Sequence, residues 1–271
     1  MPILRASLTW WRRWLAVVSV ALVAAGFAIA FRSSLATVYA WLGGQGVVEM
    51  IAHAPRWLRL ALPAAGGLAA GLIALVAARV REGGGVGFVM EAIVLGRVRV
   101  PLARTALQAV ASWCAIAAGA SLGREGPLIQ FGAAAGEGAR RAFGLDNVTA
   151  RIVIAAGVAA GFASAYNAPV AAVLFVVEVV TGVVVLEAIV PMLIAVVIAT
   201  IATRYVVGGT PVYGLRAFGF GAPAELIAFA GLGLVAAPVG VGFLRVLGAA
   251  DRLWQRVPMP WRPAAGGLAC S

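Results

Sequence analysis

The sequence predicts an all-α polytopic membrane protein with tilted and broken helices. Of its 271 residues, 63% are hydrophobic and 11% are charged, whereas a soluble domain has roughly 45–50% apolar and about 25% charged residues. Small residues cluster at 133–136 and 155–161, and such residues let helices pack closely in lipid, where no hydrophobic drive joins them. The apolar runs are either long enough to cross a bilayer or are short and interrupted by glycine and proline.

The first two apolar runs, at residues 14–31 and 60–78, have about the length that a membrane-spanning helix needs. An arginine cluster at residues 5–13 precedes the first run, and Arg79 and Arg81 follow the second. Because positive charge is enriched in cytoplasmic flanks, we expect a cytoplasmic N-terminus and an out-and-back pair of helices.

The middle of the chain contains shorter apolar segments, interrupted at residues 83–87, 123–127 and 167–169. Lipid cannot satisfy free backbone groups, so broken helices occur inside protein or beside a water-filled cavity. The N-terminus of each half-helix carries free N–H groups and partial positive charge, which suits anion binding near the membrane midplane. The alternative is a set of tight turns between ordinary spans. Longer apolar runs return at 187–203 and 225–247.

The formal net charge is +11, and apart from the single histidine every basic residue is arginine. These arginines are scattered or lie at the ends of apolar runs, which favours a role beside the lipid bilayer over nucleic-acid binding. Cys114, Cys270 and His53 show no metal or redox spacing. We therefore expect no nucleic-acid partner, no metal, no other cofactor and no enzymatic activity.

Glu125 lies between two apolar segments in the sequence Gly-Arg-Glu-Gly-Pro at 123–127, and ionisable residues at membrane depth are usually functional. Pro127 suits the first turn of a helix, which places the N–H groups of Glu125 and Gly126 at a helix entrance that attracts anions. Glu125 could occupy this anion site when ionised and leave it when protonated or displaced, and so act as a gate. The alternative is an ordinary acidic residue at a solvated helix N-terminus.

The 123–127 motif resembles the signature of the CLC family of chloride channels and chloride/proton antiporters. Residues 161–178 are similar to the family's Phe-Asn-Ala-Pro segment, and 83–87 fall where the family has Gly-Ser-Gly-Ile-Pro. The run 88–92 resembles the bacterial ClcB-type branch, and the similarity covers roughly residues 10–270.

This resemblance implies the first half of an inverted-repeat CLC-type fold in a single transmembrane domain, 1–271. The first repeat would cover about 10–205 and the start of the second about 220–271. It also implies a homodimer in the bacterial inner (plasma) membrane, with one pathway per subunit for chloride or a similar inorganic anion.

The resemblance further implies that Glu125 is the external gating glutamate. The backbone of Arg124, Glu125 and Gly126 would line the outer anion site, and Gly84 and Gly85 would contribute to the central one. Gly84 stands where the family usually has serine and offers no hydroxyl. The preferred anion therefore stays open.

The choice between channel and antiporter depends on the residues at 178 and 179. Family antiporters tend to carry a proton-relaying glutamate just after the position of Glu178, where this chain has Val179. Valine cannot carry a proton, so we expect a glutamate-gated anion channel, with a chloride/proton antiporter as the alternative. Glu178 itself is a possible proton-path residue or a structural carboxylate.

The family's second half supplies a Gly-x-Phe-x-Pro helix entrance, and this chain lacks a match to it. We therefore expect a C-terminally truncated chain, and a non-conducting fragment is the third hypothesis for its function.

Overall fold

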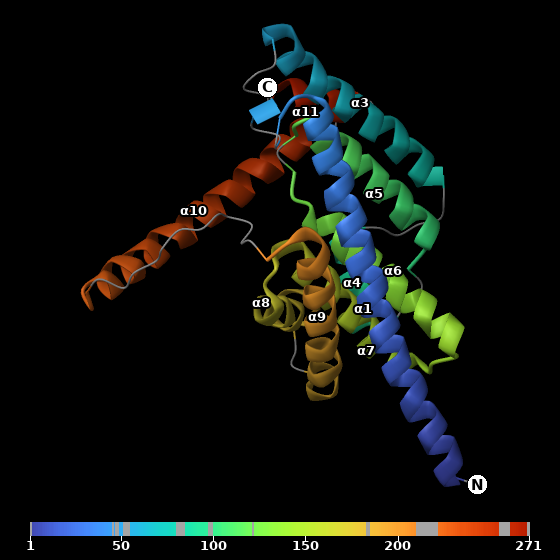
Figure 1. Cartoon of the computed structure of the whole chain (residues 1–271). Coiled ribbons are helices and arrows are strands. Elements are labelled where there is room, and N and C mark those ends of the chain that lie inside the picture. Colours follow the sequence, from blue (N-terminus) through green and yellow to red (C-terminus); the bar gives the residue numbers. More distant parts are fainter. Residues whose placement is uncertain are drawn as a thin grey trace.

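The protein is a bundle of helices packed around one central helix (Figure 1). The computed structural model describes residues 2–44, 46, 49–50, 55–79, 85–96, 100–120, 122–182, 185–209, 222–254 and 261–269. Within these ranges, side chains are described except at 2–9, 86, 264 and 267–269. The described ranges contain no strand, so the predicted all-α class is confirmed.

The helices follow one another in the order α1 (Pro2–Trp41), α3 (Arg56–Arg79), α4 (Val86–Val94), α5 (Leu102–Ala117), α6 (Glu125–Phe143), α7 (Asn147–Tyr166), α8 (Pro169–Phe175), a π-helical turn η1 (Val176–Thr181), α9 (Leu186–Val207), α10 (Glu225–Trp254) and α11 (Trp261–Ala269). By length and composition, α1, α3, α7, α9 and α10 can each cross a membrane. The helix α1 is much longer than the predicted run 14–31. It continues at both ends through polar residues, which a search for apolar runs does not include.

The core is built around α7, which contacts α1, α6, α8 and α9. Its sequence is apolar on all sides, as expected for a fully buried helix. The apolar stretch covers residues 151–166, and the helix begins one turn earlier, at Asn147. Asp146 explains the extension, because its carboxylate accepts hydrogen bonds from the backbone N–H of Val148 (3.1 Å) and Thr149 (3.3 Å) and so caps the helix.

The contact between α6 and α7 depends on glycine. A Cβ atom added at Gly132 would overlap the carbonyl oxygen of Gly157, and one added at Gly157 would overlap that of Gly132. One turn further along α6, a Cβ at Gly136 would lie 2.6 Å from the Cα atom of Ile154. The predicted close contact of small-residue faces is thus confirmed, since neither backbone could approach the other past a side chain.

The predicted break at 123–127 coincides with the start of α6 at Glu125, after α5 has ended at Ala117. The break at 167–169 also lies between two helices, α7 and α8, and Asn167 adopts a left-handed φ of 57° there. At the first break, Gly85 has a φ of 90° and precedes α4, a conformation that favours glycine. Gly84 lies outside the described residues.

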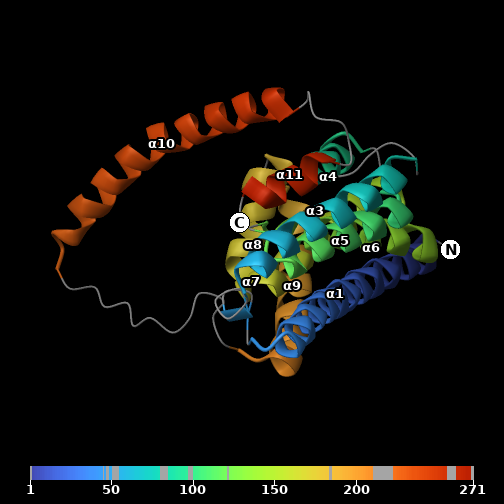
Figure 2. The same ribbon diagram turned by 90° about the horizontal axis from the view of Figure 1, so that it is seen from above.

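Two elements depart from simple apolar segments. The apolar run at 168–181 divides into α8 and η1. Such π-helical turns are rare and are frequently found at functional sites. At the other end of the chain, α10 projects away from the bundle while α11 returns to pack on α3 (Figures 1 and 2). No described residue of α10 is buried.

Candidate functional site

The N-terminus of α6 presents unpaired backbone donors. The helix begins at Glu125, and the residue before it, Arg124, supplies no side-chain cap. The first N–H groups of a helix have no intrahelical partner, and the helix dipole adds partial positive charge at the same point. The geometry that the sequence predicted for this helix entrance is present.

The carboxylate of Glu125 folds back over Gly123. A Cβ atom added at Gly123 would overlap Oε2 of Glu125 and lie 2.8 Å from its Cδ. Glycine at this position therefore leaves the space that the carboxylate occupies. In the described part of the chain, no hydrogen bond or ion pair holds this carboxylate, so no side-chain partner has to be broken when it moves.

Open space lies beside the other glycines of the predicted site. A Cβ atom at Gly126 or at Gly85 would meet nothing within 4 Å. Gly85 and Gln130 line the same narrow space between α4, α5 and α6. The buried Oε1 atom of Gln130 has no hydrogen-bond partner among the described residues. The structure therefore brings the start of α4 close to the first turns of α6, as a shared anion pathway would require.

The two residues on which the choice between channel and antiporter depends lie elsewhere. Glu178 and Val179 are both exposed on η1, and η1 packs against α4. The structure does not bury or pair Glu178 in its described surroundings. This turn nevertheless contacts α4, the helix that Gly85 precedes.

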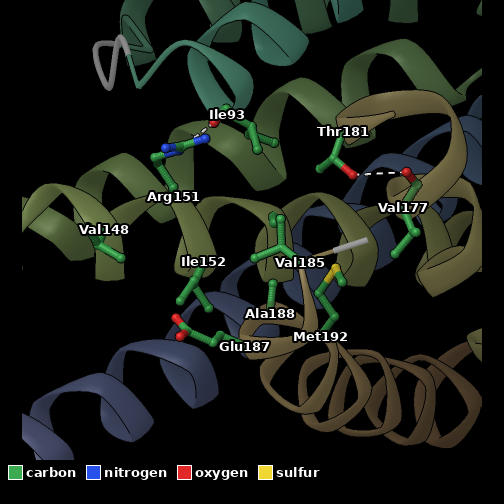
Figure 3. Close-up of a pocket in the computed structure, with 11 residues that line it drawn as sticks. Ile93, Val148, Arg151, Ile152, Val177, Thr181, Val185, Glu187, Ala188 and Met192 are labelled. Carbon is green, nitrogen blue, oxygen red and sulfur yellow. Dashed lines mark hydrogen bonds between the residues drawn. The ribbon is translucent and has the colours of Figure 1, made fainter. Parts of the chain in front are cut away.

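Arg151 holds the far end of α4, as Figure 3 shows. Its Nε donates to the carbonyl oxygen of Ile93 (2.5 Å) and its Nη2 to that of Val94 (2.9 Å). A cation at a helix C-terminus is favoured by the helix dipole. These bonds fix the direction of α4 and thereby the position of Gly85 at its other end. The sequence analysis did not identify Arg151, because its acceptors lie more than fifty residues away.

The same region contains a mainly apolar cavity, which we call the inner cavity. It lies between α7, η1 and α9, has a volume of about 190 Å³ and is lined by residues including Ile152, Val177, Ala188 and Met192 (Figure 3). Arg151 and Glu187 lie at its edge. Its lining offers little that would hold an inorganic anion.

A second arginine secures the break at 167–169. Nε of Arg204, near the end of α9, donates to Oδ1 of Asn167 at 2.5 Å. Nδ2 of Asn167 donates to the carbonyl oxygen of Gly209 at 3.2 Å. These bonds tie the junction of α7 and α8 to the end of α9, so the left-handed Asn167 serves as a structural joint.

No metal site emerges within the described ranges, where no cluster of three or more His, Cys, Asp or Glu residues occurs. Cys114 is a half-buried free thiol. Cys270 and His53 lie outside the described residues.

Comparison with known proteins identifies the family. The sequence model described as voltage gated chloride channel matches residues 65–271. This chain belongs to that family, the CLC family. A relative from Ralstonia nicotianae, described as chloride channel protein ClcB-like, is 37% identical over 250 residues, which cover 89% of this chain and 58% of the relative.

Two solved CLC-type structures share the fold. A slow cyanobacterial Cl⁻/H⁺ antiporter matches with a TM-score of 0.74 at 25% identity, over 96% of this chain and 62% of that one. A CLC-type fluoride/proton antiporter matches with a TM-score of 0.73 at 26% identity, over 94% of this chain and 63% of that one. The resemblance inferred from the motifs is thus confirmed, and the chain spans about three fifths of the length of these relatives.

Proposed function

We propose that this multi-pass CLC-family chain contributes to a transmembrane pathway for chloride or a similar anion, and that Glu125 gates it. The observation that carries the proposal is the Glu125 carboxylate, folded back over Gly123 at the uncapped start of α6. A mobile anion and this carboxylate carry the same charge and are attracted by the same N–H groups.

The gate works by competition. Two unit charges 4 Å apart repel by about 4 kcal/mol at an effective dielectric constant of about 20, so an ionised Glu125 and an anion exclude one another. Protonation removes the charge of Glu125 and lets an anion take its place. Arg124, Glu125 and Gly126 supply the backbone of this outer site, and Gly84 and Gly85 that of a central site at the start of α4.

A passive channel is favoured over an antiporter because the residue after Glu178 is Val179, which cannot bind a proton. The antiporter has its own support, since both solved relatives are named as antiporters. Purified chain in liposomes separates the two. Uphill proton movement driven by a chloride gradient would establish an antiporter, and chloride flux without proton movement a channel. Absence of any chloride flux would favour the non-conducting fragment.

The arginine cluster before the first span supports a cytoplasmic N-terminus in a bacterial inner membrane. The homodimer rests on membership of the CLC family, and the outer face of α9, where Val190, Leu193, Val197 and Ile201 are all exposed, offers an apolar surface to lipid or to a second subunit. These positions repeat at helical spacing and form an apolar stripe.

The gate is tested by replacing its titratable group. We expect Glu125→Gln to raise chloride efflux from liposomes severalfold and to flatten its dependence on pH. Glu225→Gln is the matched control, because Glu225 lies in the first turn of α10, which projects from the bundle. A folded Glu125→Gln protein with the flux and pH response of the parent chain would refute the gating role.

A further inference from the structure

A cavity of about 500 Å³, which we call the outer cavity, lies beside the start of α6. Arg32 and Tyr39 of α1 line it on one side, and Ile116 near the end of α5 on another. Arg124, the residue just before the gating glutamate, lines it too, and Val207 at the end of α9 completes the set of contributing helices. A lining residue of the outer cavity, Arg124, is therefore the direct neighbour of Glu125 in the chain.

Two like charges line this cavity. Arg32 and Arg124 are both lining residues, their positive charges repel one another, and both side chains are half-buried. No aspartate or glutamate is among the described residues that line the cavity, and in the described structure neither arginine forms a hydrogen bond or an ion pair. Partly buried charge without a counter-charge is costly. Binding of a negatively charged group in the cavity would reduce this cost.

The walls of the cavity are held in place by contacts between α1 and α5. The hydroxyl of Tyr39 donates to the carbonyl oxygen of Ile116 at 3.0 Å, and Tyr39 is only 8% exposed. Nε1 of Trp113 donates to Oγ of Ser34 at 2.9 Å. These bonds hold α1 against α5, so two walls of the outer cavity are fixed relative to one another.

We propose that Arg32 and Arg124 form a second anion site, which binds a small hydrated inorganic anion and delivers it to the gate at Glu125. One anion between two guanidinium groups replaces their repulsion with attraction. The cavity is far larger than the roughly 30 Å³ that one water molecule takes up, so the anion keeps water and the site selects by charge more than by size. This inference rests on the proposed function, because the site serves the pathway that Glu125 closes.

The test measures binding separately from transport. The purified chain in detergent is titrated with chloride, and then with nitrate, by calorimetry. We expect Arg32→Gln to weaken chloride binding by roughly fivefold to tenfold, since one of two equivalent charges is lost, and Arg32→Lys to restore most of it. Arg12→Gln, near the opposite end of the same helix, is the matched control for the loss of one positive charge.

The outcomes distinguish this site from the gate. Weaker binding with Arg32→Gln, together with lower chloride flux at low chloride concentration, supports the outer site even where Glu125→Gln leaves transport unchanged. Equal affinity and flux in Arg32→Gln and the parent chain would overturn it, whatever Glu125→Gln does. Loss of chloride binding when phosphatidylglycerol is added would assign the arginines to a lipid phosphate and would also overturn it.

Discussion

The inner and outer cavities both have arginine at their edge, and they differ in what the arginine meets. Arg151 at the inner cavity donates to two carbonyl oxygens at the end of α4. Arg32 and Arg124 line the outer cavity together, and their like charges repel one another. The same side chain is a structural anchor where backbone acceptors surround it, and a candidate ligand-binding group where they are missing.

One helix connects the two environments. Near its start, Nη2 of Arg13 in α1 donates to the carbonyl oxygen of Glu187 at 2.9 Å, at the edge of the inner cavity. Arg32 of the same helix lines the outer cavity. At 1.5 Å per residue the two positions are about 28 Å apart, close to the thickness of a bilayer's hydrocarbon core of about 30 Å. Along α1, the two cavities are therefore separated by a distance comparable to that thickness.

Arginine has a third kind of partner in this protein, a buried carboxylate. Glu137, only 2% exposed, accepts hydrogen bonds from Arg140 and Arg141, all at 2.8 Å. Here two arginines share one carboxylate partner, which offsets one of their two positive charges within the last turns of α6. The arginine pair of α6 thus has a bound carboxylate, whereas no carboxylate is among the described residues that line the outer cavity.

The largest expected effect comes from breaking the inner anchor. Arg151→Met keeps an unbranched, largely apolar stem and removes both donors to α4. We expect a loss of about 2 kcal/mol in the free energy of unfolding, since bonds from a charged donor contribute about 1.5–3 kcal/mol each and the partly exposed carbonyls regain water. Unfolding titrations in mixed micelles measure it, with Arg151→Lys as the control. If Arg151→Met were as stable as the parent chain, Arg151 would not be a structural anchor, and its contrast with the arginines of the outer cavity would be wrong.

A smaller effect is expected at Asp146, whose cap begins the helix that carries Val148 and Arg151 to the inner cavity. Hydrogen bonds with Thr149, above all from its side chain, and with Val148 lower the pKa of Asp146. A lowered folded-state pKa gives stability that is present above the ordinary aspartate value of about 3.9 and is lost as pH falls through the folded value. Asp146→Asn should cost about 1 kcal/mol or less at neutral pH and weaken the acid dependence. An equal slope of stability against pH below 5 in both proteins would contradict this.

The smallest expected effect on stability is at the outer cavity. Arg32→Gln removes a repulsion and breaks no hydrogen bond in the described structure, so stability should stay within about 0.5 kcal/mol of the parent chain. Any gain should shrink as salt is added, because salt screens partly exposed charges. Thermal unfolding at low and high salt measures it. Strong destabilisation would mean that Arg32 is an anchor like Arg151.

The sequence was sufficient where the information is local. The breaks at 123–127 and 167–169 follow from glycine, asparagine and proline within a few residues, and the entrance of α6 at Glu125 follows from Pro127. The outer cavity was not predictable in this way. Arg32 and Arg124 are far apart in the sequence, and their approach depends on how α1 packs on α5 and α6.

Other features depended on the tertiary fold as well. The π-helical turn η1 has an ordinary apolar sequence, and nothing in Val-Val-Glu-Val-Val-Thr distinguishes it from an α-helix.

One sequence signal for the outer cavity was available. Arg32 directly follows the apolar run 14–31 in a helix that continues to Trp41, and a charge within a membrane helix suggests a functional position.

The glycines of α6 and α7 have a consequence for how this protein tolerates change over time. Gly132 and Gly157 touch backbone to backbone, so even alanine would force the two helices apart. Gly126, six residues before Gly132, faces open space and would accept a methyl group without a clash. Selection for a stable fold should therefore preserve glycine at 132 and 157. Substitution at Gly126 should be limited only by its effect on anion passage.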